Sequence, residues 1–488
     1  MTPARGGMGM AGTDHGNAPD GDDGAYRTER DTMGEVRLPA EALWAAQTQR
    51  AVENFPVSGQ PLPSELIHAL GLVKRAAASV NADLGSLPGD VAAAIVAAAE
   101  RVAAGDHDDQ FPIDVFQTGS GTSSNMNANE VIATLATRAS KSPIHPNDHV
   151  NMGQSSNDVF PTALHVAAVL AIETRLLPAL ATLHGTMAEK ATQFDDVVKI
   201  GRTHLMDAVP IRLGQEFSGY ARQIELGIER VRATLPGMRE LAIGGTAVGT
   251  GLNTHAEFGT RVAAELSRLT GTGFVEAINH FEAQGTRDAY VFAAGALGTV
   301  ATSLMKIAND VRLLASGPQA GLGELVLPAI QPGSSIMPGK VNPVICESVI
   351  QVGAQVLGNA QTVGIGGQWG QLDLNVMLPV MGRNLLESVR LLANVSEVFS
   401  SRCLAGAEAN VERCAGYIEG SISMATALNP LIGYERAATI AKASYATGRT
   451  VREIAYAESG LTREQVDAAL DPRRQTEAGT GAGGSGGG

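Results

Sequence analysis

The chain has 488 residues, enough for two or three domains around a large buried core. Its 36 Lys and Arg residues stand against 50 Asp and Glu, and the net charge of −14 argues against nucleic acid or an anionic membrane as a partner. Three scattered cysteines and histidines without HExxH or HxH spacing predict neither a disulfide framework nor a metal site. No apolar run reaches transmembrane length and no signal core opens the chain, so we expect a cytoplasmic protein without cofactor or metal.

Composition predicts five regions in chain order. Residues 1–24 are rich in Gly and Asp and should be disordered. A mixed N-terminal domain is expected over 25–154, and a central domain of long bundled helices over 155–410. Short helices should form a small C-terminal domain over 411–474, and a flexible Gly-rich tail is expected over 475–488.

The central region repeats apolar residues at alternating steps of four and three, which predicts long, nearly parallel packed helices. Several of these helices are apolar on more than one side, which suggests an oligomeric core. Strand signals are sparse, and the best is near Val198–Ile200. The runs with the clearest period are Phe217, Ala221, Ile224, Ile228, Val231, Leu235; Val300, Leu304, Ile307, Val311, Leu314; Ile345, Val349, Val352, Val356; and Leu176, Leu180, Leu183, Met187.

Four polar, Gly-rich segments each precede a predicted helix: 118–130, 153–158, 201–210 and 333–343. Any one alone is explained more simply by helix capping, because Ser and Asn cap helices routinely. Four in one chain predict that several helix N-termini converge on one small polyanion, since these ends carry free N–H groups and a positive dipole.

The segment GSSIMPGKVNP, residues 333–343, is not a phosphate-binding P-loop. Five residues separate Gly333 from Gly339, and Val341 after Lys340 has no oxygen for a metal. We predict instead that Asn342 caps a helix whose first residue is Pro343, which would place the helix N-terminus beside Lys340. The segment therefore predicts an anion site of another kind.

GSSIMPGKVNP resembles the signature of the fumarase/aspartase superfamily, and the other three segments match its remaining active-site regions in order. QSSNDVFPTALH, GRTHLMDAVP, GGTAVGTGLN and HPND are most similar to class II fumarases, and the resemblance covers roughly 27–474. It implies a mainly all-α, fumarase/aspartase-like fold with a long central helical bundle flanked by two smaller domains. It further implies a metal-free homotetramer that interconverts fumarate and L-malate.

Dehydration of malate removes a weakly acidic proton next to a carboxylate and builds an aci-carboxylate with an extra negative charge. Preorganised donors aimed at that charge suit the reaction, and Lys340, Asn342 and the following helix N-terminus are candidates. A serine can act as the base only if its alkoxide is stabilised. The resemblance assigns the base to Ser334 and substrate binding to Ser335, and the physical argument alone does not choose between them.

The departing hydroxide needs a proton, and His204 is the candidate general acid because histidine exchanges protons near neutral pH. Glu347, four residues after Pro343, faces back toward the loop and is the candidate to orient it. The remaining substrate-binding candidates, beside Lys340, Asn342 and Ser335, are Ser120, Gly121, Thr122, Ser155, Ser156, Asn157 and Thr203. The resemblance also implies a second, non-catalytic dicarboxylate site at His145, Pro146, Asn147 and Asp148, although the lead-in Lys141–Ile144 is shorter than is usual in the family.

Three alternatives remain open. Aspartate ammonia-lyases usually carry Gln at the position of His204 and Ala at that of Gly339, and an amine leaves without the acid assistance that hydroxide needs. Argininosuccinate and adenylosuccinate lyases match the flanking segments poorly. A non-catalytic structural protein on the same scaffold is the rival of another class, and the joint presence of Ser334, Lys340, Asn342, His204 and Glu347 argues against it.

The active site should be shared between chains. Asn157 precedes the predicted helical run 161–195 and His204 follows it. A helix of that length spans about 50 Å at ~1.5 Å per residue, even with a bend at Pro178. Two residues so far apart cannot reach one small substrate, so we expect each site to combine residues from different chains.

Overall fold

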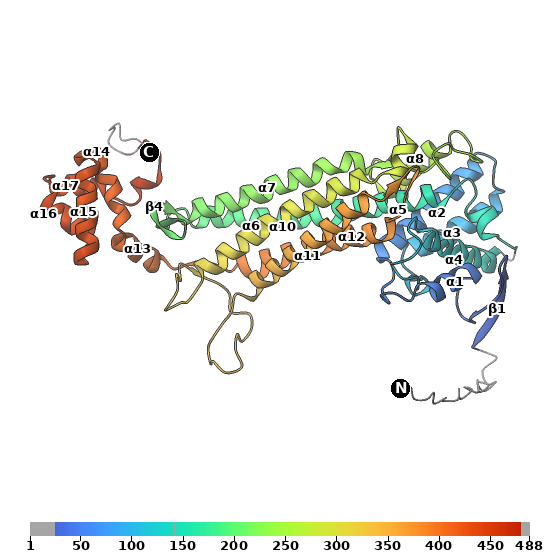
Figure 1. Ribbon diagram of the computed structural model, residues 1–488, viewed down its shortest axis with the longest axis horizontal. Coiled ribbons are helices and arrows are strands. Elements are labelled where there is room, and N and C mark those ends of the chain that lie inside the picture. The colour runs from blue at the N-terminus through green and yellow to red at the C-terminus, as the bar shows by residue number, and fades with distance from the viewer. Residues whose placement is uncertain (1–24, 141, 480–488) are drawn as a thin grey trace, which may run out of the picture.

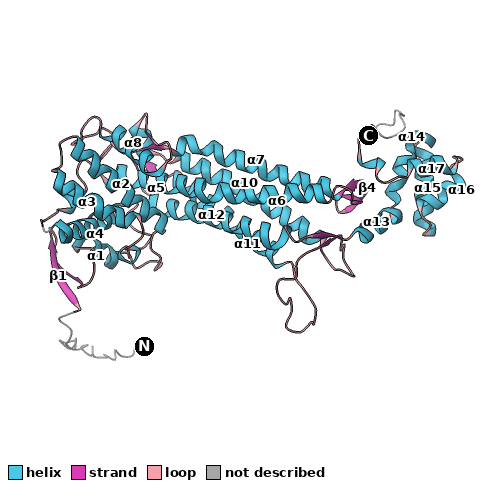
Figure 2. Ribbon diagram, turned by 180° about the vertical axis from the view of Figure 1, so that it is seen from behind, coloured by secondary structure: helices cyan, strands magenta, loops and turns pink. Residues whose placement is uncertain are grey.

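The computed structural model describes residues 25–140 and 142–479. The predicted disordered tail 1–24, Lys141 and residues 480–488 of the predicted Gly-rich tail lie outside the described residues. The molecule is elongated: a bundle of long helices runs through the middle, with smaller groups of elements at its two ends (Figure 1). Helices dominate the described residues and the strands are short (Figure 2), which confirms the predicted mainly α fold.

The N-terminal end begins with an antiparallel hairpin followed by four helices. In the hairpin, Tyr26 pairs with Pro39 and Asp31 with Gly34. Helices α2 and α3 are rich in Ala, pack against each other and bury an Ala/Val/Leu face. The elements are β1 Tyr26–Asp31, β2 Gly34–Pro39, α1 Ala46–Asn54, α2 Ser64–Asp83, α3 Gly89–Ala103, the 3-10 turn Asp108–Gln110, α4 Thr122–Ser140 and a π-helical turn, Pro146–Val150.

Six long helices form the central bundle, as the period of four and three predicted. Neighbouring pairs α6–α7, α7–α10, α10–α11 and α11–α12 pack along their lengths. Helices α5 and α6 are joined through a π-helical turn, Ile172–Leu176, that ends two residues before Pro178, so the chain runs helically from Ser156 to Gln193. The bundle helices are α5 Ser156–Ala171, α6 Leu177–Gln193, α7 Leu213–Met238, α10 Asp288–Leu314, α11 Val344–Gly367 and α12 Leu378–Phe399, which continues into the π turn Ser400–Leu404.

The predicted periodic residues of α7 and α10 form the bundle core. Phe217, Ile224 and Val231 on α7 are buried, as are Leu304 and Ile307 on α10. Helix α11 differs, because only part of its apolar surface is covered within one chain. Leu357 is 40% exposed and Ile365 45% exposed.

Two helical stretches, Ser156–Gln193 and Asp288–Leu314, are long and apolar enough to cross a membrane by length and composition alone. By this measure, the expectation that no apolar run reaches transmembrane length is wrong. About half of each apolar window, 50% and 56%, is buried inside this chain. Both helices thus contribute to the core of the bundle.

Short strands and two small helices connect the bundle helices. The predicted extended segment near Val198 is strand β3, which pairs antiparallel with β4 and contains a register shift between Ile200 and Arg202. The connecting elements are β3 Val198–Thr203, β4 Met206–Arg212, β5 Glu240–Leu241, α8 Phe258–Thr270, β6 Val275–Glu276, α9 His280–Gly285, β7 Leu325–Val326, β8 Gly370–Gln371, β9 Leu374–Asn375 and β10 Glu408–Ala409.

The C-terminal helices form a small group with their own core, located at the end of the bundle that carries β4 (Figure 1). Ile418, Leu428, Ile440 and Ile454 are buried there, and Ile200 of β3 joins them. The hairpin therefore bridges the bundle and this group. The elements are α13 Val411–Gly420, the 3-10 helix Ile422–Leu428, α14 Asn429–Ile432, α15 Tyr434–Thr447, α16 Val451–Glu458, α17 Arg463–Ala469 and the 3-10 turn Arg474–Thr476.

Candidate active site

Three predicted hydroxyl groups lie in one chain of contacts where α4 and α5 begin. The Ser120 Oγ lies 2.8 Å from Thr122 Oγ1, which lies 2.7 Å from Ser156 Oγ. Gly121 between them has φ +74, and a Cβ there would approach the Phe160 ring to 2.3 Å. The turn thus needs glycine, and it brings the hydroxyls of the first two polar segments together.

The N-terminus of α5 is fixed by a capping box. The Ser155 side chain caps the first turn, and Asp158 Oδ1 accepts from the Ser155 N–H at 2.9 Å. Asp158 Oδ2 accepts from the N–H groups of Gly244 and Thr246, at 3.1 and 2.9 Å. Burial raises the pKa of Asp158 to about 6, while these N–H groups favour the carboxylate. One carboxylate therefore joins α5 to the GGTAVG segment.

A cavity of about 360 Å³ opens at this N-terminus, lined in part by Ser155, Ser156 and Thr246. Asn157 lies beside it and donates from Nδ2 to Ala247 O at 2.8 Å. Two buried oxygen atoms of the lining, Asn125 Oδ1 and Thr246 Oγ1, have no hydrogen-bond partner among the described residues. The lining is mixed polar and apolar, and the hydroxyl groups of Ser155, Ser156 and Thr246 in it can donate to a carboxylate.

Thr203 and His204 occupy the tip of the β3–β4 hairpin. Both are exposed, and His204 and Leu205 have φ of +57 and +61. Backbone in this region is uncommon for residues with side chains and is typical of functional turns. The hairpin places the His204 imidazole at the surface of a single chain.

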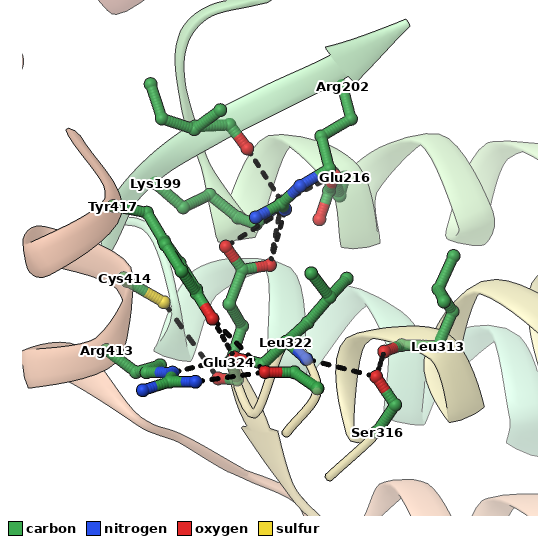
Figure 3. A network of polar contacts seen from close by, with 12 residues as sticks. Lys199, Arg202, Glu216, Leu313, Ser316, Leu322, Glu324, Arg413, Cys414 and Tyr417 are labelled. Atoms are coloured by element: carbon green, nitrogen blue, oxygen red, sulfur yellow. Dashed lines mark hydrogen bonds and ion pairs between the residues drawn. The ribbon is translucent and has the colours of Figure 1, made fainter. Parts of the chain in front are cut away.

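A buried ion network anchors the base of that hairpin (Figure 3). Glu324 is fully buried and lies 3.3 Å from Lys199 Nζ and 2.9 Å from Arg202 Nη1. Lys199 also contacts Glu216 of α7 at 3.0 Å. Burial raises the pKa of Glu216, against the attraction of Lys199. Two cations and two carboxylates thus fix β3 to α7 and to the segment before β7.

The same network extends to the C-terminal helices. Arg413 of α13 donates to the carbonyl groups of Leu322 and Gly321, at 3.1 and 3.0 Å, and the Tyr417 hydroxyl donates to the same two groups (Figure 3). The pKa of the Cys414 thiol is raised to about 12, mainly by burial. The thiol is therefore a packing group here, and it is not an activated nucleophile.

The signature segment forms a loop closed on itself. The Gly333 N–H donates to Lys340 O at 2.7 Å, and Asn342 Nδ2 donates to Gly333 O at 2.7 Å. The Ser334 Oγ accepts from the N–H groups of Ile336 and Met337, at 3.2 and 3.0 Å. Ser335 and Lys340 are exposed. The loop thus presents a serine whose oxygen already receives two backbone donors.

The predicted helix start is wrong by one residue. Helix α11 begins at Val344, Pro343 occupies the N-cap position, and no side chain caps the helix. The Asn342 amide instead closes the loop onto Gly333. Donation from Nδ2 to Gly333 O turns the Asn342 side chain toward the loop, and its oxygen caps no N–H group of α11. Glu347 lies in the first turn of α11 and is exposed.

The predicted site residues fall into two groups at opposite ends of the bundle (Figure 1). Ser120, Thr122 and Ser155–Asn157 lie where α5 begins. Thr203 and His204 lie beyond the end of α6, and α11 begins near that same end, since Cys346 of its first turn is 3.9 Å from Cys403 beyond α12. The 38 residues from Ser156 to Gln193 span about 57 Å at ~1.5 Å per residue.

The HPND segment forms the π-helical turn Pro146–Val150 that follows α4. His145 Nδ1 accepts from the Asp148 N–H at 3.1 Å, and the His149 Nδ1 accepts from the His145 N–H at 3.0 Å. The side chains of His145 and Asp148 are more than half exposed. The turn is close in sequence to the α5 cavity, and its predicted role in binding stays a prediction.

Four polar residues beside the cavity were not among the predicted site residues: Lys74, Asn151, Gln154 and Asp158. Lys74 lies within an Ala-rich helix, where it resembles an ordinary surface lysine. Asn151, Gln154 and Asp158 lie within or beside the quoted motifs, but their side chains point to neighbouring protein groups. Only the Asp158 capping spacing, Ser155 followed three residues later by an acid, was visible as a local signal.

Comparison with known proteins places this chain and its fold in a family. A family model described as "Lyase" matches residues 34–358, and one described as "Fumarase C C-terminus" matches residues 424–477. The chain belongs to this lyase family, the fumarase/aspartase class predicted from the signature segment.

Within that class, the similar proteins are class II fumarate hydratases. The chain is 60% identical to "Fumarate hydratase class II" of Corynebacterium efficiens, over 91% of this chain and 95% of the relative. It is 59% identical to the protein of that name from Mycobacterium tuberculosis, over 93% and 97%. The crystal structure of a class II fumarase from Schistosoma mansoni matches with a TM-score of 0.90 at 38% identity, over 92% and 99%. A fumarate lyase/delta crystallin from Brucella melitensis, solved bound to cobalt, matches with 0.89 at 47%, over 93% and 100%.

Proposed function

We propose that the protein catalyses the reversible hydration of fumarate to L-malate, by anti addition and elimination of water through an aci-carboxylate intermediate. The observation that carries the proposal is the joint presence of the five predicted catalytic residues in a chain 60% identical to a class II fumarate hydratase. The acidic chain still offers locally positive and donor-rich surfaces at Lys340 and at the N-termini of α4, α5 and α11.

Ser334 is the proposed base. Its Oγ accepts two backbone N–H groups, and these donors would stabilise the alkoxide that proton abstraction requires. Ser335 has no such pair of donors among the described contacts, which supports the assignment of Ser334 as base and Ser335 as a binding group. Lys340 and Asn342 would hold the aci-carboxylate from the same loop.

His204 is the proposed general acid for the departing hydroxide, and Glu347 would orient it. No hydrogen bond joins the two side chains among the described residues, so their pairing would form in the assembled protein. Ser120, Thr122, Ser155, Ser156, Asn157 and Thr203 would bind the carboxylates and the hydroxyl of the substrate. The π turn at His145–Asp148 is proposed as the second dicarboxylate site.

A homotetramer with shared sites is part of the proposal. Within one chain, the α5 group and the His204 group are separated by the length of the bundle. The outer faces of α10 and α11 also expose apolar side chains, with Phe292 58% and Leu357 40% exposed. Antiparallel packing of these faces between chains would cover them and bring opposite ends of two bundles together.

The proposal is tested by purified protein and fumarate in the presence of a chelator. We expect the ultraviolet absorbance of fumarate to fall as L-malate forms. Loss of activity on chelation, with recovery on addition of a divalent ion, would contradict the metal-free mechanism. Release of ammonia from L-aspartate without fumarate hydration would favour the ammonia-lyase alternative, and absence of both activities would favour the structural one.

A further inference from the structure

Lys74 is a fully buried cation on α2, in a helix face that is apolar apart from the buried Asn81. Its Nζ donates to Asn151 Oδ1 at 2.8 Å and to Gln154 Oε1 at 2.9 Å. No carboxylate lies within ion-pair distance of Nζ among the described residues. The charge of Lys74 is therefore not neutralised by direct contact.

The local contacts do not need this charge. Both acceptors are neutral amide oxygens, and an uncharged amine with two N–H groups would satisfy them equally well. Burial lowers the pKa of Lys74 to about 7, partly opposed by the charge of Asp158. A buried lysine in such surroundings is unfavourable for stability, which points to a use for its charge elsewhere.

The side chains of Asn151 and Gln154, the two acceptors, lie as a single layer between Lys74 and the cavity at the start of α5. Asn151 and Gln154 both line that cavity, together with Ser155 and Ser156. Asn151 Nδ2 donates to Gln154 O at 3.1 Å, and Gln154 Nε2 donates to Val150 O and Met152 O, both at 3.1 Å. Lys74 thus fixes the turn that leads into the α5 N-terminus and places a titratable amine behind it.

The other charged groups near this turn have partners of their own and do not pair with Lys74. The Asp158 carboxylate is the one whose charge acts on Lys74, and its oxygens are engaged by the N–H groups of Ser155, Gly244 and Thr246. His145, Asp148 and His149 of the π turn are engaged with one another. Arg75, the next residue on α2, is directed to Glu100, 3.6 Å away.

We infer that Lys74 is a positioning residue for dicarboxylate binding, whose ammonium group attracts the substrate carboxylate across the Asn151–Gln154 layer. The inference rests on the proposed function. Because a bound dianion favours the charged amine, the bound complex should hold the proton more tightly than the free protein. At about pH 8, above the pKa of Lys74, binding should then take up a proton from solution.

The test is titration calorimetry with succinate, a non-reacting four-carbon dicarboxylate, at pH 8 in two buffers of different ionisation enthalpy. Native protein should take up a substantial fraction of one proton per site. Lys74→Gln should lose this uptake and bind succinate about tenfold or more weakly. The variant lacks the one positive charge that attracts the carboxylate across a partly buried layer of side chains. Arg75→Gln, which removes the neighbouring, partly exposed charge paired with Glu100, is the matched control and should behave as native protein.

Succinate binding without proton uptake by native protein would overturn the inference, and this measurement needs no variant to fold. Unchanged affinity or unchanged proton uptake in folded Lys74→Gln would overturn it as well. These outcomes would leave the proposed function intact, provided native protein hydrates fumarate. Native protein that neither hydrates fumarate nor binds succinate would instead overturn the proposed function, and the inference with it.

Discussion

Arg202 donates to both carboxylate oxygens of Glu324, at 3.0 and 2.9 Å, in an ion pair two residues before His204. Glu324 is fully buried and the Arg202 side chain is only 14% exposed. The pair connects the hairpin that carries the proposed general acid to the segment that precedes β7, 122 residues further along the chain. The position of His204 therefore depends on charged groups that are not among the proposed substrate-binding residues.

Glu324→Gln should destabilise the protein by about 3 kcal/mol, because it leaves Arg202 and Lys199 buried with one carboxylate fewer. The melting temperature should fall, and fumarate turnover should fall more than substrate affinity, because the hairpin tip is displaced. Calorimetric melting and steady-state kinetics measure both effects. Glu225→Gln removes an exposed ion pair with Arg222 on α7 and should change neither. Equal melting temperatures for native protein and Glu324→Gln would contradict the anchoring role.

Ser334→Ala should lower turnover by about 10²–10⁴-fold, the range that a positioned base contributes. It should still bind succinate, because Lys340, Asn342 and the α5 group remain. Ser335→Ala is the matched variant and should mainly weaken binding. The result that reverses our assignment is an inactive Ser335→Ala beside a nearly normal Ser334→Ala.

His204→Asn should slow the release of water from malate, and Glu347→Gln should produce a milder form of the same defect. Both changes act on proton delivery, so each should alter the dependence of turnover on pH as well as its maximum. Rate profiles for the native protein and both variants test this. Profiles that keep the native shape would remove both residues from the proton path.

Much of the fold could be predicted from periodicity. Apolar residues that repeat at steps of three and four over many turns indicate long helices packed in a bundle. The start of α11 was missed by one residue, because the Asn342 side chain is held toward the loop by Gly333 O and does not cap the helix. Sequence could not reveal that Lys74 is buried, because its contacts lie 77 and 80 residues away. Nor could it connect Arg202 to Glu324.

Part of the arrangement of the candidate site could also be predicted, from helix length rather than from periodicity. Helix length alone predicted that Asn157 and His204 lie far apart within one chain. In the structure, the continuous helical path from Ser156 to Gln193 keeps them apart. Contacts within each group, such as that between Thr122 and Ser156, depend on how α4 and α5 pack. The roles of individual residues came from resemblance to the family and from the chemistry of the reaction.

The central claim is that each active site combines residues from different chains, and it is tested by mixing two inactive variants. Asn157→Ala disrupts the α5 group, and His204→Asn disrupts the hairpin group. Unfolded and refolded together, they should form mixed assemblies in which some sites receive an intact copy of both residues, and a fraction of fumarate hydration should return. Each variant refolded alone should stay inactive. If hybrid assemblies verified by mass remain as inactive as the single variants, the site is built within one chain or does not use both residues.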